Sequence, residues 1–115
     1  METVDKKWGK ELVIHNDSEY CGKVLFFNAG AKFSMHFHSK KKETWYISKG
    51  TLIFRYIDTT DASIRQCVLQ SGESVEIDRN VPHQLEAIEE SEVFEVSTQH
   101  FDDDSFRVGK GDSQC

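Results

Sequence analysis

Short runs of alternating apolar and polar residues, each followed by turn residues, fill most of this 115-residue sequence. Three of the clearest runs are residues 33–38, 43–48 and 52–57, and Gly50 and Gly72 stand where turns are expected. Alternation with a period of two indicates β-strands with one buried face, whereas helical periodicity is scarce. The sequence therefore predicts an all-β fold of about nine or ten short antiparallel strands, a sandwich or barrel with little or no helix.

The length of the chain fits one domain, which we expect to span residues 1–115, with a core at about 8–100 and a tail at about 101–115. The three consecutive aspartates at 102–104 are typical of a solvated acidic turn in that tail. Three cysteines, Cys21, Cys67 and Cys115, have the wide and irregular spacing of free thiols rather than of a disulfide framework or a zinc site.

The charge of the chain restricts its partners. A formal net charge of −6 argues against a nucleic-acid binder, because such proteins need a positive surface. No apolar run approaches the roughly 18 residues that cross a bilayer. Residues 1–15 also lack the apolar core of a signal peptide. We therefore expect a cytoplasmic protein that binds neither nucleic acid nor membrane.

His36 and His38 are separated by one residue within an alternating run. Residues i and i+2 of a strand point to the same face, so the two imidazoles project together. Glu43 begins the next run and shares its face with Trp45 and Ile47, which places a carboxylate in apolar surroundings. Such a carboxylate is costly unless it meets a metal or another partner. The three side chains predict a metal site, and imidazole with carboxylate suits Fe, Mn, Ni, Co, Cu or Zn.

A further histidine, His83, follows the only proline, Pro82. The proline fixes the backbone where a loop enters a strand, and this position brings His83 into the barrel from a neighbouring strand. Three histidines and one carboxylate leave coordination positions open for water or substrate, as catalytic metals require.

These residues belong to a larger pattern that resembles the two sequence motifs of the cupin superfamily. The first motif reads Gly30-x5-His36-x-His38-x4-Glu43-x6-Gly50, and the second runs from Gly72 to Pro82-His83. The resemblance implies a double-stranded β-helix, or jelly-roll barrel. It also implies one divalent transition metal, Mn, Fe, Zn, Ni or Co, whose ligands would be His36, His38, Glu43 and His83.

Shorter matches follow one another in the same order as in the cupin domain of type II mannose-6-phosphate isomerases, which the chain resembles. They include Lys7-Trp8-Gly9, Glu43-Thr44-Trp45, Pro82-His83-Gln84-Leu85-Glu86 and Glu95-Val96-Ser97. This narrower resemblance implies an enzyme that isomerises a small sugar derivative.

Three cations near the metal motif are candidates for substrate binding. Lys42 belongs to a run of three lysines between His38 and Glu43, Lys32 lies within the motif, and Arg55 follows it closely in sequence. In an acidic protein, such cations can attract the phosphate or carboxylate of an anionic small molecule. The alternative for each is an ordinary solvated side chain.

The last alternating run offers candidates for catalysis. Phe94, Val96, Thr98 and His100 share one face, and the two apolar members indicate that this face points inward. Thr98 would then contact the substrate near the barrel mouth, and His100 is a candidate general acid or base. In the run at 52–57, Tyr56 shares the face of Leu52 and Phe54, so its phenol is also expected to reach the cavity. The alternative to a catalytic role is a surface or tail-packing histidine for His100 and a core or interface residue for Tyr56.

Three functions fit this set of residues. The first is a metal-dependent isomerase or epimerase of a small sugar phosphate or similar hydroxy-carbonyl compound, in which the metal acts as a Lewis acid. The second is an Fe(II)-dependent cupin dioxygenase, and the third is a non-catalytic barrel that binds or senses a small molecule. Exposed edge strands in a short barrel also favour a homodimer.

Overall fold

The computed structural model describes residues 1–109 and 111, which form eleven β-strands and no helix. All-β architecture is therefore confirmed. The strands are β1 (Glu2–Lys6), β2 (Gly9–Asn16), β3 (Cys21–Phe27), β4 (Met35–Phe37), β5 (Glu43–Lys49), β6 (Thr51–Ile57), β7 (Ile64–Gln70), β8 (Ser74–Ile77), β9 (His83–Ala87), β10 (Ser91–Ser97) and β11 (Phe106–Gly109).

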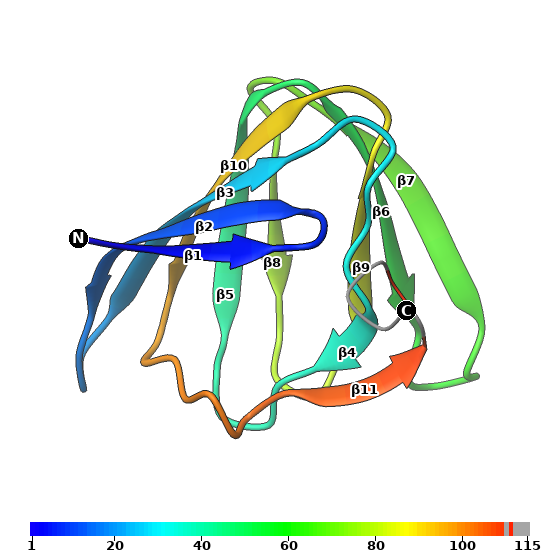
Figure 1. Ribbon diagram of the computed structural model, residues 1–115. Helices are drawn as coiled ribbons and strands as arrows, with labels where there is room; N and C mark the ends of the chain where they lie inside the picture. The colour runs from blue at the N-terminus through cyan, green and yellow to red at the C-terminus, as the bar shows by residue number, and fades with distance from the viewer. Residues whose placement is uncertain (110, 112–115) are drawn as a thin grey trace.

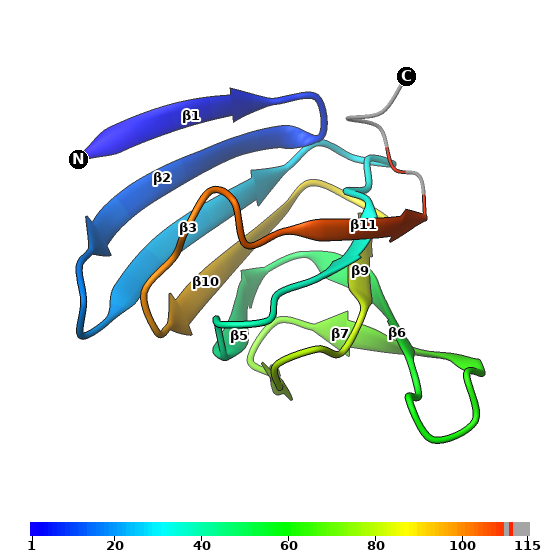
Figure 2. The ribbon, with the colours of Figure 1, turned by 90° about the horizontal axis from the view of Figure 1, so that it is seen from below.

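Two antiparallel sheets face each other and form a barrel (Figure 1). The larger sheet has the order β1-β2-β3-β10-β5-β8, and the smaller sheet has the order β11-β4-β9-β6-β7. Strands that are distant in sequence, such as β3 and β10, are therefore neighbours, as a jelly-roll barrel requires. β11 lies at the lower end of the barrel in Figure 1 and nearest the viewer in Figure 2.

The core fills one end of the barrel with large apolar side chains from both sheets. Trp45, Ile47, Leu52, Leu85 and Val93 are at most 1% exposed, and all but Leu85 alternate with exposed or half-buried neighbours along their strands. This alternation explains why the segments form strands, because each has one face to bury.

The turn between β5 and β6 requires glycine at position 50. The φ angle of Gly50 is +95°, a conformation that other L-residues rarely adopt. A Cβ atom there would also lie 2.6 Å from the carbonyl oxygen of Glu90. The glycine therefore lets β5 turn directly into β6 against the neighbouring loop.

The ends of the chain differ from the sequence-based expectation. The prediction of a non-strand tail after His100 was wrong, because Phe106–Gly109 pairs with Met35–Phe37 in the smaller sheet. β1 likewise lies outside the predicted core and pairs with β2. Among the described residues Cys21 and Cys67 are free thiols, and Cys115 lies outside them. No helix in the described part of the chain is long and apolar enough to span a membrane.

Candidate metal centre

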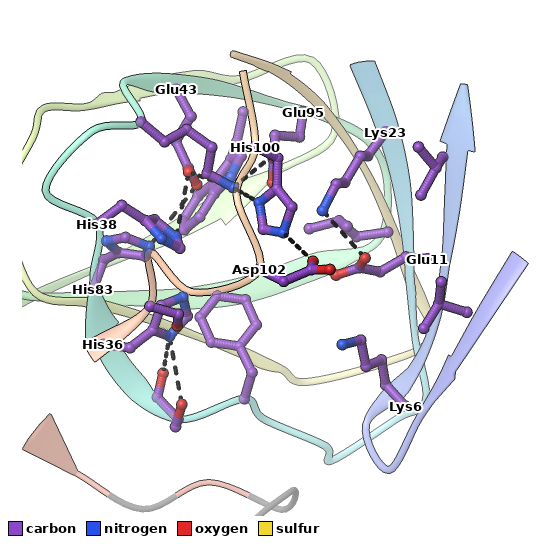
Figure 3. A pocket seen from close by; sticks show the side chains of 18 of the residues that line it. Lys6, Glu11, Lys23, His36, His38, Glu43, His83, Glu95, His100 and Asp102 are labelled. Atoms are coloured by element: carbon purple, nitrogen blue, oxygen red, sulfur yellow. Dashed lines mark hydrogen bonds and ion pairs between the residues drawn. The ribbon is translucent and has the colours of Figure 1, made fainter. Parts of the chain in front are cut away.

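Three histidines from the smaller sheet meet inside the barrel (Figure 3). His36 lies on β4, His38 follows that strand directly, and His83 begins β9, where it pairs in register with His36. One ring nitrogen from each histidine lies within 4.8 Å of the other two. The structure thus brings together the three histidines that the sequence singled out.

Each imidazole is oriented by a hydrogen bond from the nitrogen that faces away from the centre. The bonds link Nδ1 of His36, His38 and His83 to the backbone carbonyls of Ser34, Asp104 and Val81, with N···O distances of 2.7, 2.5 and 2.8 Å. A carbonyl can only accept, so we assign the Nδ1–H tautomer to each ring. The Nε2 lone pairs are then available to a metal, and the orienting carbonyls hold the rings in place.

Glu43, from the larger sheet, faces the histidines and is 3% exposed. Its Oε2 lies 3.7 Å from Nε2 of His38, and its Oε1 lies 3.8 Å from Nε2 of His83. These separations are too long for hydrogen bonds. Nε2 of His83 is fully buried and has no hydrogen-bond partner among the described residues.

A divalent metal fits these four side chains. An unpartnered polar atom in a buried site is costly, and a cation on the three Nε2 atoms would remove that cost. Three neutral imidazoles and a carboxylate form a donor set typical of catalytic transition metals. His36, His38 and His83 would hold the metal, and Glu43 would complete the set.

Burial keeps the three imidazoles neutral, as metal binding requires. Burial, and then the charge of Lys41, lower the pKa of His38 to about 4. The pKa of His83 is held well below its ordinary value by burial and then by His36. Burial also lowers the pKa of His36.

The sequence interpretation missed a buried lysine beside this centre. Lys41 Nζ lies 3.1 Å from Oε2 of Glu95, 3.3 Å from Oε2 of Glu43 and 3.3 Å from Nδ1 of His100. Burial alone would lower the pKa of Lys41, but the charges of Glu95 and Glu43 outweigh it and raise the pKa. Lys41 therefore stays an ammonium that pairs with Glu95 and Glu43, while burial and then the charge of Glu95 raise the pKa of Glu43. Residues 41, 43, 45 and 47 alternate, so the parity that placed Glu43 inward also points to Lys41.

The inward face of β10 carries Val93 and Glu95, so the assignment of Phe94 and Val96 to that face was wrong. Val96 is 61% exposed, whereas Glu95 is buried. Burial raises the pKa of Glu95, but Lys41 and Lys23 outweigh it and hold the pKa below its ordinary value. The prediction failed because it assigned the inward face by apolar residues alone, whereas Glu95 points inward as a partner of Lys41.

The three aspartates after the last long strand do not form a uniformly solvated turn. Asp104 is 2% exposed, and its carboxylate accepts hydrogen bonds from the backbone amides of Ser39, Lys40 and Lys41. The same residue offers its carbonyl to His38. Asp104 thus fastens the loop that carries His38 and Lys41 to the segment before β11.

A cavity of about 350 Å³ lies in front of the histidines. His100 lines it, and both of its ring nitrogens have partners: Nδ1 lies 3.3 Å from Nζ of Lys41, and Nε2 lies 3.2 Å from Oδ1 of Asp102. Figure 3 shows His100 and Asp102 between the histidine cluster and the Lys23–Glu11 ion pair. The cavity therefore contains titratable groups as well as the metal-binding cluster.

The other candidate side chains lie outside the lining of this cavity: Lys32, Lys42, Arg55, Tyr56 and Thr98. Lys42 is exposed, and its backbone amide donates to the hydroxyl of Thr98. Arg55 forms an ion pair with Glu86 at 2.8 Å, because odd positions of β6 face away from the core. Tyr56 stacks on Phe54, and Lys32 is half-buried. Their catalytic or binding roles stay predictions.

Solved structures with the same fold come from several proteins. CapF of Staphylococcus aureus, a capsular polysaccharide assembling protein, matches with a TM-score of 0.82 at 16% identity, over 94% of this chain and 34% of CapF. Oxalate decarboxylase of Bacillus subtilis matches with a TM-score of 0.82 at 16% identity, over 93% of this chain and 30% of the decarboxylase. KdgF of Halomonas sp. matches with a TM-score of 0.74 at 17% identity, over 90% of both chains.

The chain thus spans about a third of the length of CapF and of oxalate decarboxylase. At these identities the likeness shows the fold alone. A comparison with curated protein sequences finds no match. The cupin-domain family profile, however, matches residues 24–98, well over half of the chain. The protein therefore belongs to the cupin family.

Proposed function

We propose that the protein is a metal-dependent isomerase or epimerase that acts on a small sugar derivative or a similar hydroxy-carbonyl compound. The proposal depends on one observation above all. The ring nitrogens of His36, His38 and His83 converge inside a cavity, and Nε2 of His83 is buried there without a hydrogen-bond partner among the described residues. Structural histidines normally satisfy both nitrogens when buried, so this arrangement favours metal ligation.

Among the side chains of the cavity are two groups, metal ligands and apolar residues that line the cavity. His36, His38 and His83 would hold a divalent metal, with Glu43 as the fourth ligand. When bound, such a metal supplies Lewis acidity toward a carbonyl or hydroxyl oxygen. Trp45 and Phe33 line the same cavity and present apolar surface that restricts water beside the reacting groups.

His100 is the candidate for contact with a substrate oxygen. Because Lys41 stays an ammonium, it donates to Nδ1 of His100, and the hydrogen of the neutral ring is then on Nε2. Burial and the charges of Lys23 and Lys41 lower the pKa of His100, which keeps the ring neutral. His100 is thus suited to donate a hydrogen bond from Nε2 to a substrate oxygen while Lys41 supports Nδ1.

Two similar proteins support this direction. CapF is named for assembling a capsular polysaccharide, and the oxalate decarboxylase of Bacillus subtilis has Mn(II) centres. A protein that assembles a polysaccharide and a protein with Mn(II) centres therefore both contain this fold. Manganese is one of the metals that the histidine and carboxylate donors of this chain suit.

The test combines metal content with proton exchange. We expect metal-loaded protein to catalyse deuterium incorporation from D₂O at the carbon next to a carbonyl, measured by NMR on a panel of small aldoses, ketoses and their phosphates. His83→Ala should lose both the stoichiometric metal, measured by mass spectrometry, and the exchange. His15→Ala is the control, because His15 pairs with Asp17 at 2.8 Å and does not line the cavity. Exchange that survives His83→Ala would overturn the proposal.

A second candidate function is a non-catalytic barrel that binds a small molecule. It is favoured by the fact that both ring nitrogens of His100 are engaged, one by Lys41 and one by Asp102. This function predicts stoichiometric metal and ligand binding without deuterium exchange. Oxygen consumption by the Fe(II)-loaded protein, without exchange, would instead indicate a dioxygenase.

A further inference from the structure

The cavity opens where the two sheets do not pair with each other. β1 is an edge strand of the larger sheet, β11 is an edge strand of the smaller sheet, and residues of both line the cavity. Lys6 comes from β1 and Arg107 comes from β11. The two cations thus reach the same cavity from opposite sheets.

Most charged groups deeper in the cavity are already paired. Lys41 holds Glu95 and Glu43, and Lys23 Nζ lies 3.3 Å from Oε1 of Glu11. Such pairs satisfy their own charges, so they attract an incoming ion only weakly. They do offer hydrogen-bond donors and acceptors to the hydroxyl groups of a small polar ligand.

Lys6 and Arg107 differ from these inner groups. Neither side chain has an ion pair or a hydrogen bond within the described residues, and both are exposed to solvent at the opening. Figure 3 shows Lys6 on the same side as Glu11, across the cavity from the histidines. Glu2 also lines the cavity, but it is four residues away on β1, about 13 Å along an extended strand.

Arg107 lies beside the metal-binding cluster. It pairs in register with His36 across β11 and β4, and directly opposed residues of antiparallel strands lie close together. An anion held by this guanidinium would therefore belong to a molecule that also reaches the histidines.

We propose that Lys6 and Arg107 form a recognition site for the anionic group, a phosphate or a carboxylate, of a small polyhydroxy substrate. The cavity volume of about 350 Å³ suits a molecule of that size. The guanidinium fork binds either anion with two parallel hydrogen bonds, and Lys6 adds a second positive charge. This site rests on the proposed function for its substrate, but anion binding is measured without turnover.

The test is calorimetric binding to the metal-loaded protein and to the metal-free protein. The probes are glucose 6-phosphate, glucuronate and glucose, which share a ring but differ in their anionic group. We expect at least one of the two anions to bind about tenfold or more tightly than glucose. The difference should shrink in high salt, because charges at a solvated opening are screened. The anion that binds with the higher affinity identifies the preferred group, phosphate or carboxylate.

Arg107→Gln and Lys6→Gln should each lower the affinity for the preferred anion about tenfold and leave the affinity for glucose unchanged. Arg107→Lys should keep part of the affinity that Arg107→Gln loses. Lys49→Gln is the matched control, because Lys49 is an exposed lysine that does not line the cavity. Circular dichroism checks that each variant is folded. The proposal is wrong if glucose binds as tightly as both anions, if neither anion binds, or if Lys49→Gln weakens binding as much as Arg107→Gln. Anion binding without deuterium exchange would instead contradict only the proposed isomerase activity.

Discussion

The two ends of the same strands differ sharply in what they bury. On β5 the inward face carries Glu43 at one end and Ile47 at the other, and on β10 it carries Glu95 and Val93. All four residues are at most 5% exposed. One end of the barrel is thus an apolar core, and the other end buries charged groups beside three histidines.

The two ends contribute differently to stability. Burial of apolar surface stabilises the fold by roughly 25 cal/mol per Å², so the core end is favourable by itself. At the charged end, the attraction within the ion pairs only partly offsets the free energy lost when the charges leave water. Buried charges of this kind cluster at functional sites, and here they surround the candidate metal centre.

The substitution expected to destabilise the charged end most is Lys41→Met. The substitution keeps most of the side-chain volume but leaves Glu43 and Glu95 buried without their shared cation. We expect the free energy of unfolding to fall by about 3–5 kcal/mol, the usual cost of removing one partner of a buried ion pair. Urea denaturation followed by circular dichroism measures this change.

Lys49→Met is the control for that variant, because Lys49 is an exposed lysine at the other end of β5. Its free energy of unfolding should stay within about 0.5 kcal/mol of that of the unmodified protein. Equal losses for the two variants would mean that Lys41 is not a buried partner of the carboxylates.

Ile47→Ala tests the apolar end. Ile47 is fully buried in the core, so its truncation leaves a cavity and should lower the free energy of unfolding by about 3 kcal/mol. The amount of metal bound per chain should not change, because Ile47 does not line the cavity. Loss of metal at a temperature where the variant is still folded would show that the two ends are not independent.

Asp104→Asn tests how the loop that carries His38 is held. An amide nitrogen cannot accept the bonds that Lys40 and Lys41 donate to Oδ2, so we expect a loss of about 2 kcal/mol at neutral pH. Burial raises the pKa of Asp104, but hydrogen bonds from Ser39, Lys40 and Lys41 outweigh it and hold the pKa below its ordinary value of 3.8. The carboxylate therefore stabilises the fold above that pH, and the stabilisation disappears as the pH falls through the lowered pKa.

The measurement for Asp104→Asn is the free energy of unfolding against pH, with Asp103→Asn as the exposed neighbour control. The difference between Asp104→Asn and the unmodified protein should be full at pH 7 and shrink below 3.8. A difference that stays constant with pH would show that the charge of Asp104 does not matter.

The sequence predicted the strands and the histidines because local patterns determine both. Alternation reveals a half-buried strand without knowledge of its neighbours. His36 and His38 share a face by spacing alone, and Pro82 placed His83 where a loop enters a neighbouring strand. The short end strands β1 and β11 were missed, because their burial patterns contain almost no buried residue to mark an inward face.

The partners of residues that meet across long sequence separations could not be predicted. Alternation gives Lys41 an inward direction, but its partner Glu95 is 54 positions away, and each alone is typical of an exposed side chain. Asp104 is buried only because the loop at 39–41, more than 60 positions away, presents its amides. Arg107 reaches the cavity through a strand that the sequence analysis did not expect.

The smallest expected effect concerns the outer face of β10, which the sequence analysis assigned to the interior. Val96 is 61% exposed, so Val96→Ser should change the free energy of unfolding by no more than about 0.5 kcal/mol. Val93→Ser, at a fully buried position on the same strand, should cost several times more, because it both leaves a void and buries a hydroxyl. The comparison also bears on the expected homodimer. A Val96→Ser effect that grows with protein concentration would indicate that a second copy covers this face, and light scattering of both variants over a dilution series would detect it.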